Sequence, residues 1–73
     1  MTTASNYEFQ SELLRNAAAR GQARALLTVL DWRDVMVPDN VRDRVLECRD
    51  TGLLDIWLRR AITATTLDDV IRG

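Results

Sequence analysis

The sequence predicts an all-α protein, and three observations lead to this expectation. Apolar side chains recur at intervals of three and four residues in successive windows, which is the period of an amphipathic helix. The chain of 73 residues has one proline and three glycines, so few positions interrupt a helix. No window alternates apolar and polar residues for long enough to indicate a strand. We expect a long first helix, two medium amphipathic helices and a short C-terminal helix.

The first helix is predicted over about 6–33. Ser5 and Glu8 have the spacing of an N-terminal capping box ahead of it. One apolar ridge at i, i+4 intervals comprises Phe9, Leu13 and Ala17; a flatter ridge beside it comprises Leu14, Ala18, Gly21 and Ala25. Gly21 costs about 1 kcal/mol relative to alanine inside a helix, so it marks a break, a bend or the close approach of another helix. We favour one continuous helix, with Gly21 as the place for any bend.

The second helix is predicted to begin at Pro38. Val37 is expected to be extended because a proline follows it, and Asp39 complements the positive end of the helix dipole. The apolar face of this helix comprises Val41, Val45 and Cys48. It ends near 50–52, where the sequence leaves two alternatives open. Either Asp50 caps the next helix or Gly52 terminates this one.

The third helix carries an apolar stripe at i, i+3, i+4, i+7 spacing, which comprises Leu54, Trp57, Leu58 and Ala61. Asp55 and Arg59 are spaced to form an ion pair on another side of it. Thr66 and Asp69 resemble a capping box and predict the start of the short last helix. Trp57 is expected in the core, whereas Trp32 is equally suited to covering the core or anchoring an interface.

The apolar surface exceeds what a chain of this size is expected to bury by itself. Residues 22–73 have the pattern of a compact helical module, and residues 1–21 read as a helical extension continuous with it. A chain of fewer than about 70–80 residues usually needs a disulfide, a metal or a partner to stabilise its small core. This chain has one cysteine, which cannot form an internal disulfide. We therefore expect a homodimer. The candidate interface residues are Phe9, Leu13, Leu14, Ala17, Gly21, Ala25, Val29 and Trp32.

The charged residues exclude most small-protein chemistry. All ten basic residues are arginine, and there is no lysine or histidine, so we expect no enzyme activity, no metal site and no cofactor. Cys48 is expected to be a buried structural thiol. The acidic column of the second helix, Asp39, Asp43 and Glu47, is expected to be a solvated face rather than a metal site. Without a membrane-spanning segment or signal peptide, the chain is expected to be cytoplasmic.

Nucleic-acid binding is the alternative from another functional class. A small helical dimer would use Arg15, Arg20 and Arg24 of the first helix against phosphates. A net charge of −1 gives no electrostatic footprint for such binding, so direct contact with nucleic acid is not the preferred interpretation.

The stretch 18–71 resembles the C-terminal helical region of bacterial proteins of the Rpn type, which are recombination-promoting nucleases related to transposases. The resemblance rests on the segments GQARALL (21–27), VP (37–38), VR (41–42), Cys48, LD (54–55), WL (57–58), RA (60–61) and TATTLD (63–68). The active site of the nuclease domain in such proteins needs a lysine, and this sequence has none. The resemblance therefore implies a non-catalytic tail. It further implies a regulatory role, in which the short form dimerises or pairs with a related full-length nuclease.

Overall fold

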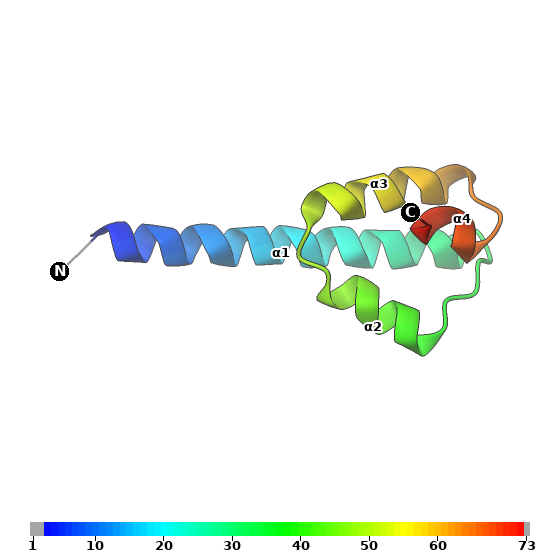
Figure 1. The fold of residues 1–73 in the computed structure, drawn as a ribbon, viewed down its shortest axis with the longest axis horizontal. Helices are drawn as coiled ribbons and strands as arrows, with labels where there is room; N and C mark the ends of the chain where they lie inside the picture. The colour runs from blue at the N-terminus through cyan, green and yellow to red at the C-terminus, as the bar shows by residue number, and fades with distance from the viewer. Residues whose placement is uncertain (1–2, 73) are drawn as a thin grey trace.

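The computed structural model describes the backbone of residues 3–72 and the side chains of residues 11–72. It contains α1 (Thr3–Trp32), α2 (Asp39–Glu47), α3 (Thr51–Thr63) and α4 (Leu67–Ile71), and no strand within that range (Figure 1). The all-α prediction is confirmed. The capping box predicted at Ser5 lies two residues inside α1, because the helix already begins at Thr3, and the side chains of Ser5 and Glu8 lie outside the described residues.

The first helix is a single rod that passes through Gly21 without a break. Its 30 residues, at about 1.5 Å each, extend for about 45 Å. The molecule measures 52 × 21 × 20 Å along its principal axes, so this helix accounts for most of its longest extent. Figure 1 shows that the N-terminal half projects beyond the other helices, whereas the C-terminal half lies between α2 and α3. Ala19 is the first buried side chain along the described part of α1.

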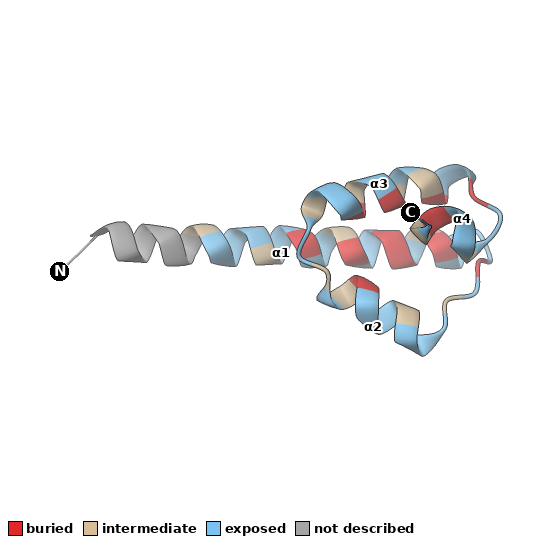
Figure 2. Cartoon of the chain, in the orientation of Figure 1, coloured by how far each residue is buried: buried red, intermediate tan, exposed pale blue. Residues whose placement is uncertain are grey.

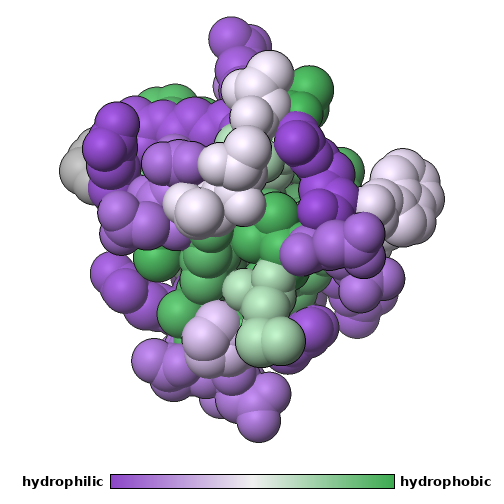
Figure 3. Space-filling view, turned by 90° about the vertical axis from the view of Figure 1, so that its right-hand side faces the viewer, coloured by the Kyte–Doolittle hydropathy of each residue, from purple (hydrophilic) through white to green (hydrophobic). Residues whose placement is uncertain are grey.

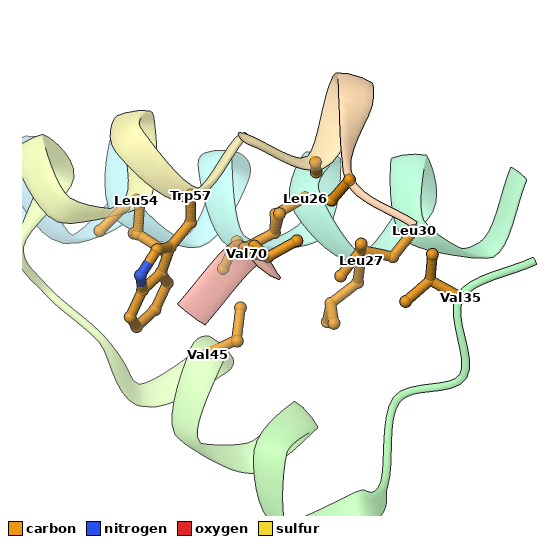
Figure 4. Close-up of a cluster of buried hydrophobic side chains, with 12 residues drawn as sticks. Leu26, Leu27, Leu30, Val35, Val45, Leu54, Trp57 and Val70 are labelled. Atoms are coloured by element: carbon orange, nitrogen blue, oxygen red, sulfur yellow. The ribbon is translucent and has the colours of Figure 1, made fainter. Parts of the chain in front are cut away.

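The core lies where the C-terminal half of α1 meets the other helices (Figures 2 and 4). Helix α1 packs most extensively on α3, and α4 closes over α3. Leu26, Leu30, Val45, Leu54 and Val70 are the largest fully buried side chains. Each contributes about 1.5–3 kcal/mol when it leaves water. The predicted stripe of α3 faces this core, and Trp57 is buried there as expected.

A Schellman turn ends α1 and directs the chain toward α2. The N–H of Val35 donates to the main-chain oxygen of Leu30 at 2.9 Å, and that of Asp34 donates to Asp31 at 3.1 Å. Asp34 adopts the left-handed conformation with φ of 59°, which the motif requires at this position. Leu30 and Val35 are both buried, so the turn is fixed by apolar packing as well as by its hydrogen bonds.

The remaining caps resolve the alternatives that the sequence left open. Asp50 is the N-cap of α3, and its Oδ1 accepts a hydrogen bond of 3.1 Å from the N–H of Leu53. Gly52 therefore lies inside α3 rather than ending α2. Pro38 is the residue before α2 instead of its first helical residue. Thr66 caps α4 as predicted, with its Oγ1 accepting from the N–H of Asp69 at 3.3 Å.

Candidate interaction surface

The side of α1 turned away from the core forms a continuous exposed surface, which we call the outer face of α1. It comprises Leu14, Ala18, Gly21, Ala25, Thr28 and Trp32, all of them exposed. Successive members are separated by four and three residues in alternation, which is the spacing of the seam between two paired helices. Gly21 and Ala25 each lie two residues from the buried Ala23, so each lies about 200° from it around the helix.

Large apolar side chains stand at the two ends of the outer face. The exposed fraction is 69% for Leu14 and 77% for Trp32. Small residues occupy the positions between them, so the middle of this surface is low. Helix backbones approach one another most closely where side chains are small. The outer face therefore consists of small residues between two large apolar ones.

Gly21 lies at the middle of the outer face and has no steric role within the protomer. In the described part of the chain, apart from its two neighbours and the backbone of its own helix, nothing lies within 4 Å of the position that a Cβ on Gly21 would take. Its φ is not in the left-handed range, so the backbone does not require a glycine there either. An exposed glycine in a helix interior costs about 1 kcal/mol relative to alanine. The protomer alone gives no reason for this residue.

The predicted interface residues separate into different places. Leu14, Gly21, Ala25 and Trp32 belong to the outer face. Leu13, 56% exposed, and Ala17 lie on its flank. Val29 is half-buried and packs against the core, because it is on the boundary between α1 and its neighbours. The side chain of Phe9 lies outside the described residues. Ala18 and Thr28 were not among the predicted interface residues, although the alternating spacing of four and three identifies both.

The flank of α1 borders a groove of ≈ 430 Å³. Leu13 and Ala17 line it from the N-terminal half of α1, and Leu46 and Cys48 line it from the end of α2. Cys48 is half-buried, and its Sγ–H donates to the main-chain oxygen of Asp50 at 3.8 Å. The sequence predicted a buried thiol, and the structure buries it only in part; it packs against the core and contributes to the turn between α2 and α3.

The arginines of the alternative nucleic-acid surface face acidic residues of α2. Arg20 and Arg24 line one side of a groove of ≈ 340 Å³, and Asp43 and Glu47 line the other. Both pairs have i, i+4 spacing, so the two rows run beside each other. Among residues 11–72, Asp55 and Arg59 form the one ion pair below 4.0 Å, at 3.1 Å. No ion pair below 4.0 Å joins the two rows, so their opposite charges compensate one another across the open groove. Arg15 lies apart from this groove and is exposed.

The described residues were also compared with the requirements of a metal site and of a membrane span. Within the described residues there is no group of three or more metal-ligating side chains, and this includes the column Asp39, Asp43 and Glu47. Of the helices described, none combines the length and apolar character that crossing a bilayer requires. Figure 3 views the module from the end opposite the N-terminus, where hydrophilic residues surround the apolar areas. Outside α1, the large exposed apolar side chains among the described residues are Met36, Leu53, Ile56 and Ile62.

Comparisons with family models, with curated proteins and with solved structures find no match to this chain.

Proposed function

We propose that the chain is a non-catalytic helical interaction module that forms a homodimer through the outer face of α1. The observation that carries the proposal is the continuous stripe from Leu14 to Trp32, which is exposed in the protomer and has Gly21 at its centre. Covering a large apolar side chain stabilises a complex by about 1.5–3 kcal/mol. A second copy supplies a surface of matching length and character.

The projecting half of α1 gives independent support to this proposal. Most of the stability of a helix in a protein comes from packing of an apolar face rather than from helix propensity. Residues 3–18 form helix, and Ala19 is the first buried side chain among residues 11–32. Contact with a partner along Leu14 and Ala18 would stabilise this half of the helix. Dimerisation and helix formation are therefore coupled in the proposal.

We further propose a regulatory role in which the same surface binds a related nuclease of the Rpn type. The support is the resemblance of residues 18–71 to the C-terminal helical region of that family, together with the lack of lysine in the sequence. A partner that carries an equivalent helix would present an equivalent stripe. Competition between homodimer and heterodimer would then set how much of the nuclease is paired with the short chain.

Direct binding to duplex DNA receives less support from the geometry. Arg20 and Arg24 face Asp43 and Glu47, so phosphates approaching these arginines also meet carboxylates. Phosphate contacts give an affinity that falls steeply as salt rises. A titration with duplex DNA at low salt separates the two functions, since the interaction module is expected to show no salt-dependent binding.

A dilution series followed by circular dichroism tests the proposed dimer. Helical signal and thermal midpoint should both rise with protein concentration, because a partner that binds only the folded chain stabilises it by mass action. The substitution Leu14→Gln should weaken this dependence. Ile56→Gln is the matched control, because Ile56 is also exposed, at 46%, but lies on α3. Concentration-independent unfolding of the wild type would contradict the proposal.

A further inference from the structure

Helix α2 buries less of its surface than its neighbours along the chain do. Val45 is its one buried side chain, and Val41 and Leu46 are half-buried, whereas α3 buries three side chains (Figure 2). Pro38, the residue before α2, makes no side-chain hydrogen bond to the first turn, so this turn lacks a cap. An element with little buried apolar surface opens to solvent more readily than the rest of a fold.

Side-chain hydrogen bonds connect α1, α3 and α4 and leave α2 out. Arg33, the residue after α1, donates to the main-chain oxygen of Ala61 in α3 at 3.2 Å. Arg60 of α3 donates from Nη1 to the main-chain oxygen of Arg72, the residue after α4, at 2.6 Å. Among the described side chains, no hydrogen bond and no ion pair below 4.0 Å joins α2 to another helix. Apolar packing around Val45 and attraction between charges therefore hold α2 in place.

Opposite charges face each other where α2 approaches the middle of α1. Asp43 and Glu47 line one wall of the groove of ≈ 340 Å³, and Arg20 and Arg24 line the other. All four side chains are exposed, and none of them forms an ion pair below 4.0 Å, so the attraction acts through water. Arg49, which follows α2, lines a neighbouring groove with Arg20 and Glu47 and thus faces one like and one opposite charge.

A second groove repeats this arrangement with the signs exchanged. Arg42 of α2 lines a groove of ≈ 370 Å³ together with Asp31 and Asp34 at the end of α1. All three side chains are exposed, and again no ion pair below 4.0 Å joins them. The charges of α2 therefore match those of α1 at two separate places. This pattern favours the position that α2 takes along α1.

We propose that α2 is a salt-sensitive flap, which opens from α1 as a unit while α1, α3 and α4 remain packed. Attraction across water is screened by salt, since the Debye length falls from about 10 Å at 0.1 M to about 3 Å at 1 M ionic strength. In the open state Arg20 and Arg24 no longer face carboxylates, and Val45 enters water. Opening thus changes both the charge and the apolar character of this side of α1.

The chain segments at the two ends of α2 suit such an opening. They are short, comprising residues 36–38 and 48–50. Each adjoins a fixed point, because Val35 is buried in the core and Asp50 is the N-cap of α3. Neither charged groove includes a residue of the outer face of α1, so the flap opens independently of the proposed homodimer.

Hydrogen exchange followed by NMR tests the flap in the intact chain. The amides of 43–47 in α2 and of 55–63 in α3 are compared in one sample, at about 20 mM and at about 1 M sodium chloride. We expect the α2 amides to be less protected than those of α3. Salt should raise the opening of α2 relative to α3 by about two- to tenfold, the range for a few exposed charge pairs. Because the ratio comes from one molecule, a general loss of stability does not imitate the result.

Charge-removing variants test whether the two rows attract each other. Asp43→Asn combined with Glu47→Gln should raise α2 opening at low salt and reduce its salt dependence. Arg20→Gln combined with Arg24→Gln should do the same, and all four substitutions together should add little, because either pair already removes the attraction. Arg44→Gln is the matched control, since Arg44 lies on α2 but lines neither charged groove. It should keep the salt dependence of the wild type.

Three results would overturn the proposal. Equal protection of α2 and α3 at both salt concentrations would show that the two helices open only together. Preferential opening of α2 that does not change with salt would show that charge does not hold the flap closed. Fully additive effects of the two pairs of substitutions would show that the two rows do not act on each other.

Discussion

Arg33 joins the end of α1 to the end of α3 by donating a hydrogen bond of 3.2 Å from Nη1 to the main-chain oxygen of Ala61. The same nitrogen also donates to the main-chain oxygen of Ile62. The last turn of a helix has carbonyl groups without partners inside the helix, and a positive charge there is favourable. The core sits between these two helices, so Arg33 stabilises the edge of the packed module.

Replacing Arg33 by alanine is expected to lower the free energy of unfolding by about 1 kcal/mol, since a charge-assisted bond is partly screened at an exposed site. Arg59→Ala is the matched control. Arg59 pairs with Asp55 within one helix, and its side chain is 79% exposed, so its loss should change stability little. Urea denaturation of the two variants measures the difference, and equal effects would show that the contact with α3 contributes nothing.

The turn after α1 should respond to residue 34 according to its left-handed backbone. Asp34 has φ of 59°, a conformation that β-branched residues avoid and glycine adopts freely. Asp34→Val is expected to destabilise the chain by about 1–2 kcal/mol. Asp34→Gly and Asp34→Asn should leave stability unchanged or raise it slightly. Thermal unfolding of the three variants gives the order, and a valine variant as stable as the glycine variant would contradict this account of the turn.

Gly21→Ala should have opposite effects on the protomer and on the dimer. Alanine favours a helix by about 1 kcal/mol over glycine, and the described residues leave space for its Cβ. The same methyl group would separate two helices that approach closely at this position. Thermal unfolding should therefore show a stabilised variant at high dilution and a weaker concentration dependence than the wild type. Equal stabilisation at every concentration would show that Gly21 is not part of the interface.

Asp69 gives the chain a specific response to acid. The hydroxyl of Thr66 is the main cause that lowers the pKa of Asp69 below its ordinary value of 3.8, and Thr65 contributes as well. A carboxyl group with a lowered pKa in the folded state stabilises the fold above its unfolded pKa, and this contribution is lost as the pH falls through the folded pKa. We expect stability to decline below about pH 4. The decline should be shallower in Thr66→Ala than in Thr66→Ser, as measured by urea midpoints across this range.

The sequence predicts the features of this fold that depend on local periodicity. Leu54, Trp57 and Ala61 are buried together because the helical period alone places them on one face. The cap formed by Thr66 is likewise a local pattern, and the structure contains it. The left-handed Asp34 could not be predicted, because that conformation depends on how Leu30 and Val35 pack on each other in the core.

Features that depend on the positions of whole helices were less accessible from the sequence. Val29 has the spacing of an interface residue, yet it is half-buried and packs against the core. The other helices cover a wider part of the α1 surface than a single apolar stripe predicts. The juxtaposition of Arg20 and Arg24 with Asp43 and Glu47 requires the docked position of α2. The exposure of Trp32 likewise excludes one of the alternatives that its sequence position left equal, namely that this side chain covers the core.

The molar mass in solution tests the central claim most directly. Size-exclusion chromatography with light scattering at tens of micromolar should give twice the chain mass of 8.3 kDa for the wild type. Leu14→Gln should shift this value toward the mass of one chain. A wild-type mass of 8.3 kDa across the whole concentration range would contradict the claim that a second copy covers the outer face of α1.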